Sequence, residues 1–269
     1  RSIYRSNYCL RWKVMKRIMC TVAYDGTLFN GYQRQPGQRT VQGEIEAALE
    51  KICKVPITIH SSGRTDTGVH AYGQVFHFDS EVNMDGTRYV RALNSMLPED
   101  IYVLDSHEVH PEFHSRYHGK IKEYRYKLSL NTYNPMKRHY VYYHRRPLDV
   151  AKMREAMTYL LGTHDFTSFC GNLDEINKER TIYQAELLDE EGELTFIFVG
   201  NGFLRYMIRI MVGTLIQVGE GRKQPEDIKK ILEMKDRRLA GHTAKPQGLY
   251  LQRVDYPEEL LKPLADIEE

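Results

Sequence analysis

The order of strand and helix signals between residues 16 and 109 leaves few folds open to this chain. Residues 16–24 alternate apolar and polar side chains, which is typical of a strand with one buried face. Thr40 can cap a helix that runs to about Cys53, because apolar residues recur there at helical spacing. Further strands are expected at 57–59, 74–79 and 101–109, with a helix at 87–96. Ferredoxin-like and RNA-recognition folds have this strand–helix–strand–strand–helix–strand order.

The rest of the chain repeats this order loosely. The expected elements are a strand at 120–130, a helix at 149–161, strands at 181–188 and 194–199, helices at 203–218 and 225–239, and a strand at 248–251. We therefore expect an α+β protein with two α/β halves, at 15–112 and 113–269. Residues 1–14 are basic and contain no acid, which is typical of an upstream extension or a disordered arm.

Composition limits the class of protein. The 269 residues are 41% hydrophobic and 28% charged, which predicts a globular core. The net charge is only +2, so binding to a polyanion must depend on local charge. No apolar run approaches the roughly 20 residues that span a bilayer. The four cysteines have no CxxC spacing, which argues against a zinc or redox motif and favours the cytoplasm.

The stretch at 61–71, SSGRTDTGVHA, stands between two predicted strands. Gly63 and Gly68 bracket Arg64 and Asp66, and glycine allows backbone angles that other residues resist. A turn of this kind can present one carboxylate at a sheet edge beside its basic neighbour. On composition alone, a solvated polar turn with a surface aspartate is the alternative interpretation.

This stretch resembles the signature of the tRNA pseudouridine synthase A family, usually close to GRTDAGVHA, with Thr67 in place of the alanine. Residues 23–33, AYDGTLFNGYQ, resemble the opening motif of the same family. Matching pieces run from about Lys16 to Tyr256. The resemblance implies two α/β halves whose sheets join into one curved mixed sheet flanked by helices, with the active cleft at the junction. It also implies a homodimer.

The resemblance further implies an isomerase that converts uridine to pseudouridine in tRNA, at positions 38, 39 and 40 of the anticodon stem-loop. This reaction breaks the N-glycosidic bond, turns the uracil and forms a C–C bond to the same sugar, with no oxidation and no water. One carboxylate that can act as nucleophile or base, and a pocket that retains the detached base, are enough. The catalytic residue is therefore expected to be Asp66, and neither a cofactor nor a metal is needed.

Arg209 lies in the otherwise apolar helix predicted at 203–218. A guanidinium in such a helix is costly unless it meets a partner, and a carboxylate in an apolar cleft needs one to stay ionised. We therefore expect Arg209 to pair with Asp66, and the resemblance places the family's arginine at this position. The alternative is an arginine whose stem covers the core while its head reaches water.

Three further residues are expected to bind the substrate. Tyr124, in KEYRY, matches the family's tyrosine that stacks on the target base, and its hydroxyl is a candidate for the final proton transfer. Leu249, in GLYL, matches a leucine that packs on the uracil. Arg64 lies two residues before Asp66 and should face the same side, where it suits a phosphate or the everted nucleotide. Without the resemblance, Tyr124 and Leu249 would be assigned to the core.

The target base must be flipped out of a stacked arm, which costs a few kcal/mol. Contacts to the RNA backbone should offset that cost, and we expect some members of a group of ten basic residues to make them. The alternative for any single member is a solvated surface position. The group is Arg34, Arg39, Arg88, Arg91, Arg116, Lys120, Lys137, Arg138, Arg145 and Arg146.

Two rival functions remain open. The first is a non-catalytic RNA-binding protein of the RNA-recognition type. In such a protein the Arg-Thr-Asp turn would have no role, and this chain lacks the aromatic pattern that RNA-recognition domains use to stack bases. An N-glycosidase would need a water-activating group, which we do not find. His60, His70 and His77 are close in sequence, but strand alternation and the intervening turn argue against a shared metal site.

Overall fold

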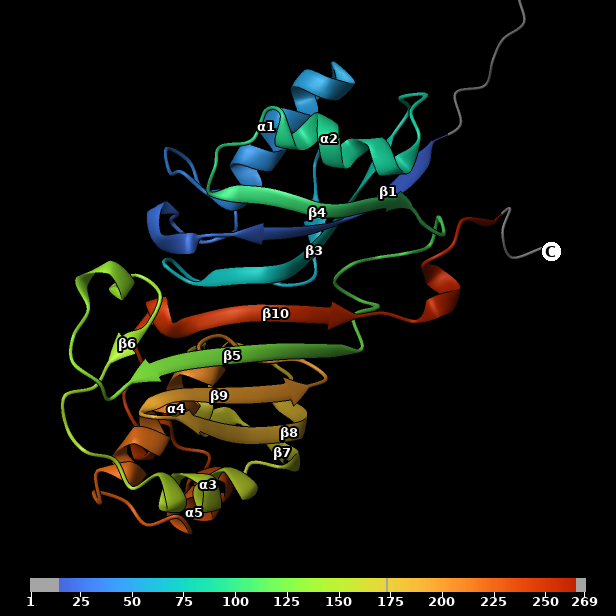
Figure 1. Ribbon diagram of the computed structural model, residues 1–269. Coiled ribbons are helices and arrows are strands. Elements are labelled where there is room, and N and C mark those ends of the chain that lie inside the picture. The colour runs from blue at the N-terminus through green and yellow to red at the C-terminus, as the bar shows by residue number, and fades with distance from the viewer. Residues whose placement is uncertain (1–14, 173, 265–269) are drawn as a thin grey trace, which may run out of the picture.

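One mixed sheet of ten strands organises the molecule (Figure 1). The structure, a computed structural model, describes residues 15–172 and 174–264. The extension predicted at 1–14 lies outside these residues. The strand order is β4-β1-β3-β10-β5-β9-β8-β7, with β2 paired to β3 and β6 paired to β5. None of the described helices is long and apolar enough to cross a membrane.

The N-terminal half has the predicted order of elements. They are β1 (Lys16–Tyr24), α1 (Val41–Cys53), β2 (His60–Ser61), β3 (His70–Ser80), α2 (Tyr89–Asn94) and β4 (Ile101–Glu108). The strand expected at 57–59 is displaced to β2, because the Ile59 N–H donates to the carboxylate of Glu46 at 3.1 Å rather than to a strand. The helix expected at 87–96 is shorter, because Asp85 first caps a 3-10 turn at 86–88.

The C-terminal half adds the remaining elements. They are β5 (Ile121–Ser129), β6 (Tyr142–Tyr143), α3 (Val150–Thr158), β7 (Gly162–Asp165), β8 (Glu179–Glu190), β9 (Glu193–Gly200), α4 (Met207–Gly219), α5 (Asp227–Met234) and β10 (Leu249–Asp255). The short strands β6 and β7 were not predicted, because two to four residues are too few to show an alternating pattern.

Three further helices differ from the prediction at one end, and the first of them, α3, ends at Thr158 rather than at residue 161. The helix expected from residue 203 begins at Met207, because Tyr206 adopts a left-handed backbone with φ +62°. The helix expected to reach residue 239 ends at Met234, since Lys235 is also left-handed, with φ +50°. Residues 237–239 then form a separate 3-10 turn that Asp236 caps. Neither left-handed position is a glycine, so no residue type marks these two helix ends.

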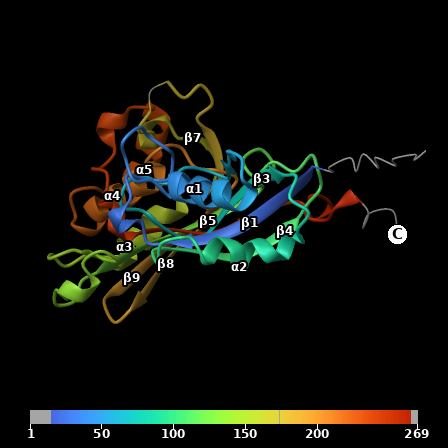
Figure 2. The ribbon, with the colours of Figure 1, turned by 90° about the horizontal axis from the view of Figure 1, so that it is seen from above.

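The last strand, β10, joins the two halves. It pairs in parallel with β3, where Tyr250 faces His70, and antiparallel with β5, where Leu249 faces Tyr126. Leu249 packs in the core beneath α3, α4 and α5, whereas Leu251 packs in the core beneath α1 and α2. Residues two apart on a strand share one face. The two cores therefore meet on one face of the sheet, and Figure 2 shows α1, α4 and α5 gathered on that side.

Candidate active site

The opening motif at 23–33 holds the turn that carries Asp66. The hydroxyl of Tyr24 lies 2.7 Å from the Oγ1 of Thr65, and the backbone N–H of Tyr32 donates to the Thr65 carbonyl at 3.0 Å. Within the turn, the Val69 N–H donates to the Asp66 carbonyl at 3.1 Å. The backbone on both sides of Asp66 is thus fixed by buried contacts.

Two glycines of these motifs are required by geometry. A Cβ on Gly26 would lie only 1.9 Å from the carbonyl oxygen of Val69, so any side chain there would push the opening motif off the turn. Gly68 has φ +78°, in the left-handed region that favours glycine. The resemblance in sequence therefore corresponds to a specific packing of one motif on the other.

Arg209 of α4 reaches Asp66 across the junction of the halves. Its Nη1 donates to Oδ2 of Asp66 at 3.1 Å, and its Nε donates to the carbonyl of Ala244 at 2.7 Å. The Asp66 side chain keeps 27% of its surface exposed, which leaves the carboxylate an opening to solvent. Burial raises the pKa of Asp66 above the usual carboxyl value, and the charges of Arg209 and Arg205 oppose that rise.

Tyr124 and Leu249 stand on the sheet beside this pair. Tyr124 is half-buried on β5 and meets Phe203 edge-on, with ring centroids 5.3 Å apart. Burial raises the pKa of Tyr124 well above that of a free phenol, and the charges of Tyr24 and Asp66 add to the rise. Leu249 is buried at the start of β10.

Arg64, the fifth predicted site residue, is exposed and makes no hydrogen bond or ion pair within the described part of the chain. Its head group is therefore available to a ligand in solution. Asp66 and Arg209 are in direct contact, and Tyr124 and Leu249 lie on the strands at the same junction.

Lys122 is a residue of this site whose contact the sequence did not reveal. The alternation of β5 placed it on the face of Tyr124, but without a role. Its Nζ donates to the carbonyl of Ser62, at the start of the turn, at 2.6 Å. Burial lowers the pKa of Lys122 to about 8, and the charges of Arg116 and Arg180 contribute. An ammonium thus lies against the backbone that leads to Asp66.

His70, at the other end of the turn, was also missed. Its Nδ1 accepts the N–H of Gly26 at 3.0 Å, so the proton is on Nε2, which donates to the carbonyl of His139 at 2.8 Å. Burial lowers the pKa of His70. The imidazole is therefore a neutral group with one fixed tautomer, and it links the turn to the segment after β5.

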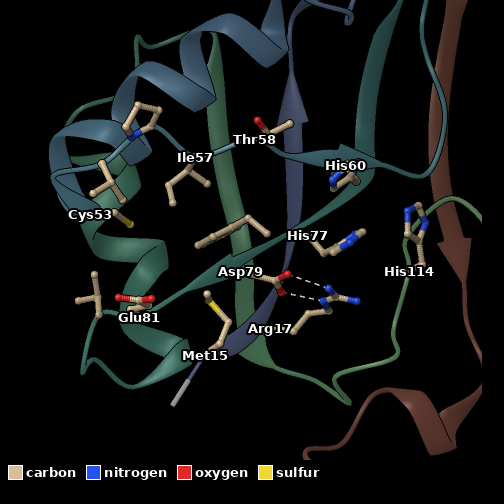
Figure 3. A pocket seen from close by; sticks show the side chains of 14 residues that line it. Met15, Arg17, Cys53, Ile57, Thr58, His60, His77, Asp79, Glu81 and His114 are labelled. Carbon is tan, nitrogen blue, oxygen red and sulfur yellow. Dashed lines mark hydrogen bonds and ion pairs between the residues drawn. The ribbon is translucent and has the colours of Figure 1, made fainter. Parts of the chain in front are cut away.

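The other two histidines considered earlier, His60 and His77, line a separate cavity of about 560 Å³ (Figure 3). Arg17 and Asp79 form a two-point ion pair in it, at 2.8 and 2.7 Å. Burial lowers the pKa of His77 to about 3, helped by the charges of Arg17, His114 and His60. No residue of the Asp66 site lines this cavity. Across residues 15–172 and 174–264, no group of three or more His, Cys, Asp or Glu could hold a metal ion.

The family model and the similar proteins that match this chain all point to the same family. A family model described as tRNA pseudouridine synthase matches residues 21–118 and 156–257. A tRNA pseudouridine synthase A from Anoxybacillus flavithermus is 52% identical over 244 residues, covering 90% of this chain and 99% of that protein. The corresponding protein of Geobacillus kaustophilus is 49% identical over 249 residues, covering 91% and 96%. One from an Exiguobacterium species is 51% identical over 243 residues, covering 90% and 98%.

Proposed function

Because this chain belongs to the tRNA pseudouridine synthase family, an isomerase family that acts on tRNA, we propose that it modifies uridines 38, 39 and 40 of the anticodon stem-loop with Asp66 as the nucleophile. The observation that carries the catalytic assignment is the ion pair between Asp66 and Arg209 at 3.1 Å. It brings a charged partner from α4 to the only acid in the signature turn. The substrate positions rest on the family resemblance.

The proposed chemistry needs one ionised carboxylate. The Asp66 carboxylate forms a bond to C1′ of the everted nucleotide while the bond from C1′ to N1 of the uracil breaks. The uracil turns within the pocket, and its C5 attacks C1′ and displaces Asp66. C5 then loses its proton and N1 gains one, so atoms and charge balance without a cofactor. Arg209 supports the ionised form, because its charge opposes the effect of burial on the pKa of Asp66.

The neighbouring residues would hold the base during this rotation. Stacking on Tyr124 contributes about 1–3 kcal/mol, and Leu249 closes the apolar side of the pocket. The raised pKa of Tyr124 keeps it a neutral phenol at physiological pH. This supports stacking, and a hydroxyl that relays a proton by hydrogen bonding, rather than a phenolate base. Exposed Arg64 is suited to a phosphate of the flipped nucleotide.

Product analysis on a single anticodon stem-loop tests the proposal. Each oligonucleotide carries one uridine, at position 38, 39 or 40, and a control carries its uridine only outside them. Pseudouridine at those three positions and an unmodified control are the expected result. Free uracil would indicate an N-glycosidase, and bound but unchanged RNA a binding protein, the two rival classes. Modification of the control alone would overturn the assigned positions.

The homodimer is an expectation that follows from the family resemblance alone. The chain should form a homodimer, and sedimentation velocity at micromolar concentration should give twice the mass of 31.6 kDa. A monomer under these conditions would contradict it. The cytoplasmic location stays a prediction.

A further inference from the structure

The segment Asn131–Pro147, here called the arm, connects β5 to the loop before α3 and contains β6. It carries four Lys or Arg residues, four tyrosines and no Asp or Glu. The whole chain is nearly balanced, with 38 Lys and Arg against 36 Asp and Glu. A local excess of this kind, with aromatic residues among the cations, is the composition of a nucleic-acid contact.

The side chains of the arm at 131–138 and 145–147 are turned to solvent. Met136 is 79% and Tyr133 55% exposed. Lys137 approaches a carboxylate only at 4.0 Å, from Glu193. The other three cations, Arg138, Arg145 and Arg146, are exposed and form no ion pair with any residue that the structure describes. These charges are therefore free to meet phosphates, and the exposed rings can stack on bases.

The arm also lies at the end of the sheet where the Asp66 turn lies. Figure 1 shows it beside the end of β5 and the beginning of β10. The turn with Asp66 directly precedes β3, which runs parallel to β10. The arm and Asp66 therefore occupy the same edge of the molecule.

Three hydrogen bonds hold the middle of the arm, at His139 and Tyr140, against the two motifs of the site and β10. His70 donates to the His139 carbonyl at 2.8 Å, and the Tyr140 hydroxyl donates to Asp25 at 2.6 Å. The Tyr250 hydroxyl donates to the Tyr140 carbonyl, also at 2.6 Å. His70 follows the Asp66 turn and Asp25 belongs to the opening motif. The two motifs that form the site thus also set the place of the arm.

We propose that the arm is an RNA-contacting surface that binds backbone phosphates of the substrate stem, and that His70 is the positioning residue that fixes the arm relative to Asp66. The identity of the RNA rests on the proposed function. The neutral, single tautomer of His70 suits this role, since its two ring nitrogens bridge Gly26 and His139 in a defined direction.

The first test neutralises two cations of the arm, Lys137→Gln with Arg138→Gln. The matched control neutralises two exposed lysines on helices, Lys51→Gln with Lys230→Gln, and so has the same net charge. Binding of tRNA to the full-length chain is measured from about 50 to 200 mM salt. Each phosphate contact contributes about 0.9 to the slope of log K against log salt, so the slope should become shallower by about 2 in the arm variant. The control should keep the wild-type slope.

An arm variant with the wild-type slope would overturn the proposal, as would an equal change in the control. This outcome is separate from the proposed function. If the wild-type chain makes no pseudouridine but its salt slope depends on the arm, the function fails and the arm stands. If pseudouridine forms normally and the slope does not depend on the arm, the arm fails and the function stands.

The second test separates positioning by His70 from a general structural role. His70→Phe keeps a ring against Tyr250 but removes both hydrogen bonds, whereas His70→Gln retains a donor and an acceptor. His70→Phe should weaken tRNA binding and reduce the salt slope, and His70→Gln should restore most of both. Combining His70→Phe with the neutralised arm should add little, because both changes remove the same contact.

Fully additive losses in this double-mutant cycle would show that His70 does not act through the arm. If His70→Phe fails to fold, the cycle is run with His70→Leu, which also removes both hydrogen bonds. Additivity in that cycle would equally overturn the positioning role.

Discussion

Arg209 touches Asp66 with one nitrogen and the Ala244 carbonyl with another, so its guanidinium is held in a single orientation toward the carboxylate. A bond to the backbone removes the freedom of a long side chain to swing into water. The Asp66 carboxylate therefore meets a charge whose position is set by α4 and by the segment before β10. This relationship makes the site sensitive to changes in either half of the chain.

Removing the carboxylate should abolish the reaction without abolishing binding. We expect Asp66→Asn and Asp66→Ala to bind tRNA within about threefold of the wild type, because the RNA contacts lie on other residues. Neither should release tritium from uridine labelled at C5. The melting temperature of each variant provides the control for folding. Turnover at the wild-type rate by either variant would falsify the assignment of Asp66 as nucleophile.

Removing the guanidinium should move the acid limb of the pH–rate profile. Burial raises the pKa of Asp66 and the Arg209 charge lowers it, so Arg209→Met should raise that pKa further. The reaction needs the ionised form, and the rate should therefore begin to fall at a higher pH in the variant as the solution is acidified. Measuring kcat/KM from pH 5 to 8 tests this. An acid limb at the wild-type position would show that Arg209 does not control the charge of Asp66.

The aromatic ring of Tyr124 and its hydroxyl can be tested separately. Tyr124→Leu removes the ring and should reduce kcat/KM about tenfold or more, since base stacking contributes about 1–3 kcal/mol. Tyr124→Phe keeps the ring. If the hydroxyl relays the last proton, Tyr124→Phe should lose activity mainly in kcat. Full activity of Tyr124→Phe in single-turnover experiments would exclude the hydroxyl from proton transfer and leave stacking intact.

The pH–rate profile should have a basic limb that depends on the charge of Lys122. Its ammonium donates a charge-assisted bond to the Ser62 carbonyl, and its pKa of about 8 means that the charge is lost as the pH rises through that value. We expect kcat/KM to fall above about pH 8 as the turn loosens. Lys122→Arg should keep its charge and extend activity to higher pH, whereas Lys122→Met should be slow at every pH. A basic limb that is identical in all three proteins would contradict this role.

The sequence predicted the strands and helices best where one face of an element is buried along its length. Residues 16–24 and α1 were correct to the residue, because Thr40 caps the helix and the apolar spacing is regular. The start of α4 was wrong, since the left-handed backbone of Tyr206 has no signature in the sequence. The partners of β10 were equally hidden, because a short terminal strand carries no information on which distant strands it joins.

The sequence predicted those parts of the candidate site in which the surroundings of a single side chain require a partner. A guanidinium in an apolar helix and a carboxylate between glycines suggested their own pairing, which the structure contains. Lys122 and His70 act through backbone carbonyls of remote segments, Ser62 and His139. Any residue type supplies a carbonyl, so no pattern of side chains reveals such a contact before the fold is known.

The central position of β10 also bears on when activity first arises. It is translated after every other described strand, yet it belongs between β3 and β5. Until it emerges from the ribosome, the halves lack their common seam and Leu249 is missing from the proposed uracil pocket. A nascent chain halted before residue 249 should therefore be catalytically inactive, even if its first half has folded.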